Sequence, residues 1–202
     1  LDATFLDAPL RLAEALAFQS RWDDAALEAT AVIDAAREQG REDLVCSAYT
    51  VLANSAFGRD AYEEAAQWGE KAVESAERSG DRERVATSVY ALARSLRILD
   101  PPRGRASFER ALALHRELGN RLGEAKALHA LGTMADDDGE PATAADLFER
   151  AIEITRELGA VRMEGSCCTV RRSCSVRPIL RRRSRSSSEP SRSTGREESS
   201  AP

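Results

Sequence analysis

The chain has 202 residues and a formal net charge of −5, and 42% of its residues are hydrophobic but only 5% are aromatic. It contains no run of about 18 apolar residues, and its start, LDATFLDAPL, lacks the basic and apolar regions of a secretory signal, so we expect neither a membrane span nor export. Alanine and leucine supply most of the apolar side chains, which favours closely packed helices over a sheet.

The charge is unevenly divided along the chain. Residues 165–202 contain nine arginines and three glutamates, a balance of +6, which leaves −11 for residues 1–164. An acidic segment is poorly suited to phosphate contacts, so we do not expect residues 1–164 to bind nucleic acid.

Four amphipathic segments, each closed by a glycine, recur about every 40 residues. They are residues 25–40, 65–80, 106–119 and 145–159. A period of this size indicates one helix-turn-helix unit that is copied and stacked. Each unit is therefore expected to contain a first helix, a short turn, a second helix and a glycine stop in the left-handed conformation.

The expected helices alternate in chain order between first and second positions of the units. The first helices are expected at about 4–18, 43–57, 83–98 and 122–136, and the second helices at about 23–38, 62–78, 105–117 and 142–157. The turns within units are expected at Ser20–Arg21, Gly58–Asp60, Asp100–Pro102 and Asp137–Pro141.

Small residues recur where the two helices of a unit would touch. The fourth unit has the pair Leu131-Gly132 followed by Ala135, Phe148 and Ala151, and the earlier units have Leu12-Ala13, Leu52-Ala53 and Leu92-Ala93. This order resembles the tetratricopeptide repeat (TPR) family, although the period exceeds the common one of about 34 residues. HEAT-type repeats have a similar period but lack this order, and they are the alternative.

The resemblance implies an all-α fold, an α-α superhelix forming a right-handed solenoid. It covers a domain of residues 1–164, with units at about 1–40, 41–80, 81–120 and 121–160. The segment RELGNRLGEAKALHALG (Arg116–Gly132) is similar to TPR arrays of large bacterial regulators, in which an ATPase and a DNA-binding domain precede the array. The chain also lacks an initiating Met, so we expect it to be a piece of a longer protein. The resemblance implies that this piece is a cytoplasmic, non-catalytic segment of a larger bacterial transcriptional regulator, which binds a partner or acts as a sensor. A stand-alone TPR adaptor is the alternative.

From the family register, the first helix of each unit lines the inner face of the solenoid. The expected peptide-binding groove contains Thr50, Asn54, Phe57, Tyr90, Arg94, Arg97, Lys126, His129 and Thr133, with Ser47 and Thr87 on the same helix faces. Its basic members can hold an acidic or extended peptide by charge-assisted hydrogen bonds, although a solvated face is an equal alternative. Thr50, Tyr90 and His129 stand where a chaperone-type clamp would need lysine, so capture of a chaperone tail is not expected.

No motif in the sequence indicates an enzyme. It contains no P-loop, no dinucleotide fingerprint after a strand, no zinc-protease motif and no nucleophile elbow, so we expect no catalytic residue, cofactor or metal. The two histidines, His115 and His129, are expected to face solvent or a groove. Cys167, Cys168 and Cys174 lack a fourth zinc ligand, while the isolated Cys46 suits a reducing cytoplasm.

The repeat pattern stops where a fifth unit should begin. Residues 165–202 contain eleven serines and nine arginines, a composition that favours disorder, and the abrupt change suggests a frameshift or a truncation. The segment RRRSRSSS (Arg181–Ser188) leaves nucleic-acid binding through this tail as an alternative function.

Loss of a fifth unit also affects the expected core. Leu147, Ile154 and Leu158 then risk exposure, which predicts dimerisation, aggregation or a frayed end of the array. Most apolar residues of the second helices, Leu27 among them, are expected in the core.

Overall fold

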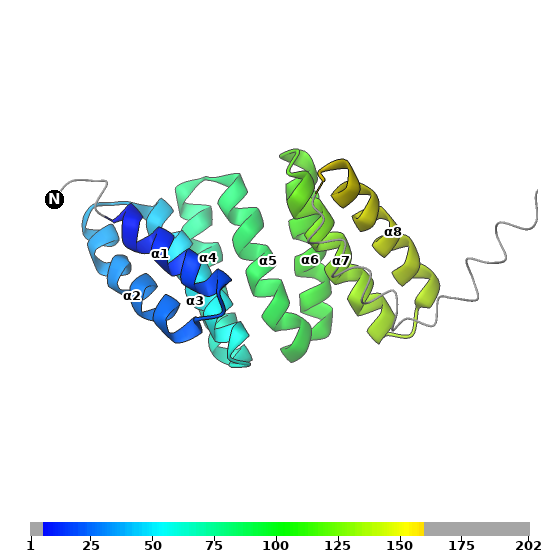
Figure 1. Cartoon of the computed structure of the whole chain (residues 1–202), viewed down its shortest axis with the longest axis horizontal. Helices are drawn as coiled ribbons and strands as arrows, with labels where there is room; N and C mark the ends of the chain where they lie inside the picture. The colour runs from blue at the N-terminus through cyan, green and yellow to red at the C-terminus, as the bar shows by residue number, and fades with distance from the viewer. Residues whose placement is uncertain (1–5, 160–202) are drawn as a thin grey trace, which may run out of the picture.

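The structure is a computed structural model, and it describes residues 6–159. These residues form eight α-helices: α1 (Asp7–Phe18), α2 (Trp22–Glu38), α3 (Glu42–Gly58), α4 (Tyr62–Ser79), α5 (Arg82–Leu99), α6 (Pro101–Glu117), α7 (Arg121–Asp137) and α8 (Pro141–Glu157). Successive helices pack side by side as four helical hairpins (Figure 1). The expected all-α helical repeat is therefore confirmed. The expectations for residues 165–202, including disorder, the cysteines and the arginine-serine segment, lie outside the described residues.

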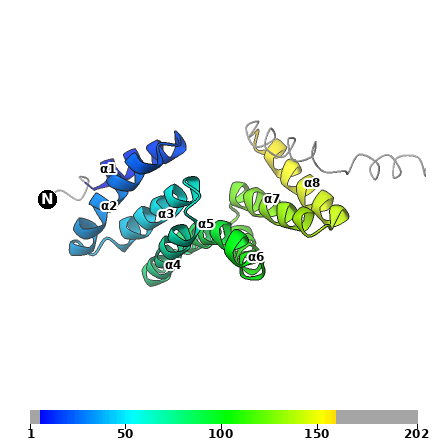
Figure 2. The ribbon, with the colours of Figure 1, turned by 90° about the horizontal axis from the view of Figure 1, so that it is seen from below.

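The hairpins follow an arc. Figure 2 shows α1, α3 and α5 on the inner side of the curve and α2, α4 and α6 on its outer side. On the inner side α1 packs on α3 and α3 packs on α5, whereas α7 meets α5 only marginally. The fourth hairpin is joined to the third mainly through α6 and α7.

Small residues allow the paired helices to approach, as expected. A Cβ atom at Gly132 in α7 would lie 2.8 Å from Cε1 of Phe148 in α8, so the phenyl ring occupies the space that a larger residue would take. Gly58 allows a close approach between units instead, because a Cβ at this position in α3 would lie 2.4 Å from Cε2 of Trp22 in α2. Gly58 is thus the last residue of a helix and not part of the turn in which we expected it.

The glycine stops adopt the conformation that the sequence predicts. Gly40, Gly80, Gly119 and Gly159 have φ between 63° and 70°, a region that costs residues with a Cβ about 1–2 kcal/mol. The prediction for the third turn is wrong, because Pro101 and Pro102 begin α6. A first-turn proline needs no backbone N–H partner, and the Asp100 carboxylate caps this helix by accepting a bond from the Arg103 backbone N–H at 3.2 Å.

Two predictions about burial are also wrong. Leu27 is 71% exposed, because it lies on the outer helix α2 and no described neighbour covers it. Ile154 is only 4% exposed, since it packs in one apolar cluster with Leu131 and Met134 of α7. Leu158 is 47% exposed, as expected, and Leu147 is half-buried.

Within residues 6–159, every helix is too short or too polar to cross a bilayer. The same part of the chain contains no group of histidine, cysteine and carboxylate side chains that could hold a metal ion.

Candidate binding groove on the inner face

A cavity of about 660 Å³ opens between α1, α3 and α5 on the inner side of the arc, with Lys126 of α7 at its edge. We call this cavity the concave groove. Five of the nine predicted site residues line it: Thr50, Asn54, Tyr90, Arg94 and Lys126. Ser47 and Thr87, which the register also places on this face, line it too.

The Arg94 side chain is held by α3 on the groove wall. Its Nη1 donates a hydrogen bond to Asn54 Oδ1 at 2.8 Å, and its guanidinium carbon lies 4.0 Å from the centre of the Phe57 ring. Burial lowers the pKa of Arg94, and the nearby Arg97 lowers it further. Phe57 does not line the groove, but it supports the residue that does.

The predicted positive cluster is divided in the structure. Arg97 does not line the groove, because its Nη1 pairs with Asp137 Oδ2 of α7 at 3.2 Å. Among the described residues, neither Arg94 nor Lys126 has a carboxylate within ion-pair distance. The groove therefore contains two cations without a carboxylate partner in the described part of the chain.

Thr50 and Tyr90 line the groove, and each is held by contacts within the protein. The Thr50 hydroxyl donates to its own helix at Cys46 O, 3.0 Å away, and also lies 3.3 Å from Ser88 Oγ. The Tyr90 ring packs edge-on against Phe108 with ring centres 5.4 Å apart, and burial raises the pKa of its phenol. Tyr90 thus stays neutral at physiological pH.

His129 and Thr133 lie outside the groove. The His129 ring packs on Phe148 with centres 5.4 Å apart, and burial lowers the pKa of its imidazole. The Thr133 hydroxyl donates to His129 O at 3.0 Å. The expectation that His115 faces solvent or a groove is wrong, since it is 4% exposed and packs against Gly123 between α6 and α7.

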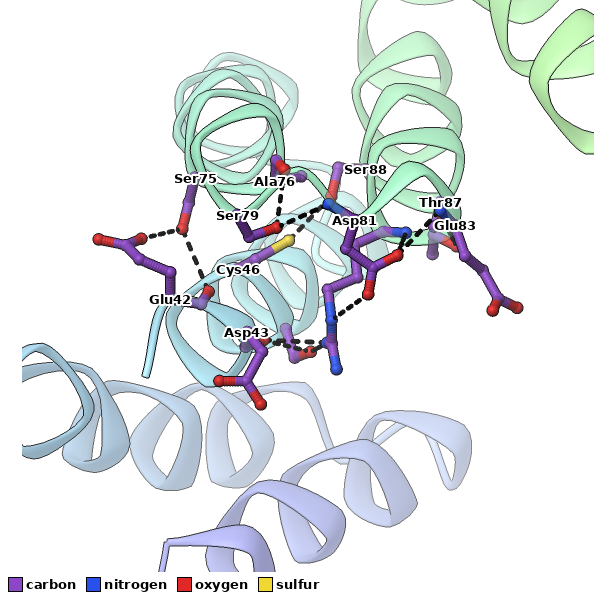
Figure 3. Close-up of polar contacts among 12 residues, drawn as sticks. Glu42, Asp43, Cys46, Ser75, Ala76, Ser79, Asp81, Glu83, Thr87 and Ser88 are labelled. Atoms are coloured by element: carbon purple, nitrogen blue, oxygen red, sulfur yellow. Dashed lines mark hydrogen bonds and ion pairs between the residues drawn. The ribbon is translucent and has the colours of Figure 1, made fainter. Parts of the chain in front are cut away.

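A polar network closes the groove where α3 and α5 begin. Asp81 caps α5 by accepting from the Glu83 and Arg84 backbone N–H groups at 3.0 and 3.1 Å (Figure 3). The Arg84 side chain in turn donates to Asp81 Oδ2 at 3.0 Å and to Asp43 O at 2.9 Å. Arg84 is therefore neutralised within the protein.

Cys46 lies at the base of the same region. Its Sγ is 3.3 Å from Ser88 Oγ (Figure 3), and burial is the main cause that raises the pKa of the thiol. A thiol held neutral in this way is a poor nucleophile, so its place in the groove indicates no chemistry.

The first hairpin contributes a wall of the groove that the predicted site does not include. Glu14, Ala17 and Phe18 of α1 and Trp22 of α2 line the groove opposite α5. The repeat register contained the signal, because Glu14, Asn54 and Arg94 are spaced at intervals of 40 residues and all three line the groove.

Two family models match the sequence, both described as tetratricopeptide repeat, over residues 45–79 and 100–157. No curated protein matches it. Among solved structures, the apo form of RapI is similar, with 13% identity, a TM-score of 0.71 and coverage of 80% of this chain and 60% of RapI. A Rap protein complexed with competence and sporulation factor has 17% identity and a TM-score of 0.70, and the match covers 75% of this chain and 43% of that one.

A further similar structure consists of the TPR-like repeats of a kinesin light chain from Podosopora anserina. It has 17% identity and a TM-score of 0.60, and the match covers 75% of each chain. The chain thus spans less than two thirds of either Rap structure, and at these identities the likeness concerns the fold alone.

Proposed function

We propose that this chain, which belongs to the tetratricopeptide repeat family, binds a segment of a partner protein in its concave groove. In this proposal the chain acts by binding alone and catalyses no reaction. The observation that supports this most directly is the cavity of about 660 Å³ on the inner face. A cleft of this size, lined by apolar walls with a few placed polar groups, is typical of binding sites. The Rap protein, which has a similar fold, is complexed with a factor in its solved structure.

The groove can be blocked without disturbing the core. Thr87 lines the groove and is exposed on α5. Within residues 6–159 its hydroxyl bonds only to its own helix, at Glu83 O. Thr87→Trp should fill the groove, whereas Gln67→Trp adds the same bulk on the outer helix α4, where Gln67 is exposed. We expect partner proteins captured from a cell extract by the full chain to be lost with Thr87→Trp and kept with Gln67→Trp.

Mass spectrometry of the captured proteins checks this expectation, with helicity by circular dichroism as the control for folding. Equal capture by both variants would place the binding surface elsewhere and would contradict the proposal.

We further propose that the chain is the cytoplasmic partner-binding segment of a larger bacterial transcriptional regulator. The likeness of Arg116–Gly132 to TPR arrays of such regulators supports this. A stand-alone adaptor is the second candidate. The genomic sequence upstream of Leu1 decides between them, because an ATPase or DNA-binding domain in the same frame is expected only for the regulator.

A further inference from the structure

Arg94 has hydrogen-bonding capacity that the described chain does not use. A guanidinium carries five N–H donors, and the only bond that Arg94 makes within residues 6–159 is the one to Asn54 Oδ1. Arg84, the other arginine that lines the groove, is bound to Asp81. Arg94 is thus the arginine of this groove that is available to a ligand.

Burial without a counterion has a cost. Arg94 is half-buried, and taking a charge out of water is unfavourable unless an opposite charge or hydrogen bonds compensate for it. No carboxylate of its own helix is close enough to neutralise Arg94, because Glu83 lies eleven residues earlier, about 16 Å along the helix axis. Glu14, on the facing helix α1, makes no ion pair with it. A carboxylate supplied by a ligand would provide the missing compensation.

The guanidinium is also oriented in advance. Its carbon lies over the Phe57 ring, 4.0 Å from the ring centre, and Asn54 accepts one of its N–H groups. This bond uses the Asn54 amide oxygen and leaves the amide NH₂ group without a partner among the described residues. The charged guanidinium of Arg94 and the neutral amide NH₂ of Asn54 are thus adjacent donors, and they match the two oxygens of a carboxylate.

Apart from Glu14, the side chains that line the groove around the first hairpin are apolar. Ala17 and Phe18 face the groove from α1, Trp22 from α2 and Val51 from α3, and Phe18 is 73% exposed. An aliphatic or aromatic side chain of a ligand would remove this surface from water.

We propose that Arg94 and Asn54 receive the side-chain carboxylate of an aspartate or glutamate in the bound segment, while a neighbouring apolar side chain packs on the Phe18 wall. The partner is thus a segment that combines an acidic and an apolar residue. This inference rests on the proposed function and specifies its ligand.

Selection from a random twelve-residue peptide library displayed on phage tests the inference with the full chain as bait. The peptides are displayed without a free carboxyl terminus, so an enriched acid must act through its side chain. We expect enrichment of a pattern that contains one aspartate or glutamate and one apolar residue. Selection on Thr87→Trp serves as the blocked control.

The role of Arg94 is then measured with a synthetic peptide of the enriched sequence. Arg94→Met should weaken binding by about tenfold or more, because it removes a charge-assisted pair. Replacing the acidic residue of the peptide by its amide should weaken binding to the wild type as much as Arg94→Met does. The same replacement should change the affinity of the Arg94→Met variant by less than about twofold. Arg97→Met is the matched control, and it should bind as the wild type does, since Arg97 is held by Asp137.

The two proposals fail in different ways. The carboxylate site would be overturned if the enriched peptides lacked an acidic residue. It would also be overturned if the affinity lost in Arg94→Met and the affinity lost with the amide peptide were additive. Either result would leave groove binding intact. No enrichment over the Thr87→Trp control would overturn both.

Discussion

At the scale of single residues, the sequence predicts backbone conformation better than it predicts side-chain contacts. The glycine stops adopt left-handed conformations because their position in the repeat requires it. Two turns within hairpins contain residues with a Cβ in the same region, Ser20 with φ 61° and Asp60 with φ 60°. The fourth unit has a glycine at its corresponding turn, Gly139, with φ 75°. Ser20 and Asp60 therefore bear a cost that Gly139 avoids.

Ser20→Gly should stabilise the protein, because it relieves a strained left-handed residue at an exposed turn. We expect a gain of about 0.5–1 kcal/mol in the free energy of unfolding, after the entropy that glycine adds to the unfolded chain is subtracted. Gly40→Ala is the reciprocal control. A Cβ there meets nothing within 4 Å, so the expected loss of about 1 kcal/mol is conformational alone. Urea denaturation measures both, and a loss of stability in Ser20→Gly would contradict this explanation.

Contacts between units were the part of the site that the sequence predicted least well. The repeat register places Asn54 and Arg94 on the same face, and in the structure they are hydrogen-bonded, because equivalent positions on neighbouring first helices lie side by side. The register could not show that Arg97 is used by Asp137, since the direction of a long side chain depends on its neighbours. Within the fourth unit, the His129 ring packs on Phe148, and His129 does not line the groove.

At the scale of elements, the junction between α6 and α7 differs from the others. The fourth hairpin has little contact with α5, so this junction carries most of the connection between the third and fourth units. His115 is buried in it, and its Nδ1 has no hydrogen-bond partner in the described part of the chain. Burial lowers the pKa of His115, and the positive charge of Lys126 lowers it further, while Glu83 acts in the opposite direction. Arg116 and Arg121 bind the adjacent, buried Glu124.

The lowered pKa of His115 predicts that the protein loses stability in mild acid. The unfolded chain gains a proton near pH 6.5, whereas the folded chain resists it, so the free energy of unfolding should fall as pH drops below 6.5. The slope is at most about 1.4 kcal/mol per pH unit for each such histidine, and burial lowers the pKa of His129 as well.

His115→Gln removes one of these protonations, so we expect a shallower fall between pH 7 and pH 5 by urea denaturation. The carboxylates of Asp43 and Glu124, whose pKa values are lowered, contribute only as pH falls below their ordinary values of 3.8 and 4.5. An unchanged slope in His115→Gln would show that this histidine does not couple pH to folding.

The helices themselves were largely predictable. Amphipathic periodicity and glycine stops located all eight within a few residues, because both signals are local. The start of α6 was missed because two prolines indicate a break but also suit the first turn of a helix. The first hairpin's wall of the groove was missed because α1 supplies it through Ala17 and Phe18, residues that resemble ordinary core positions.

At the scale of the whole molecule, the arc creates a surface that no single unit contains. The groove draws its lining from three units and from Lys126 of the fourth, so its shape depends on how the hairpins stack. Residues 1–164 carry a charge of −11, yet Arg94 lines the groove without a carboxylate partner in residues 6–159. A positive site within an acidic domain favours ligands with a local negative charge and a defined orientation.

Site-specific photo-crosslinking tests most directly whether the partner lies in the concave groove. A photoreactive phenylalanine derivative is placed at Thr87 in the groove or at Gln67 on the outer helix α4, and the full chain is irradiated with its captured partner or an enriched peptide. We expect a crosslinked product from position 87 and none from position 67. Crosslinking from position 67 alone would contradict the account and place the functional surface on the outer side of the arc.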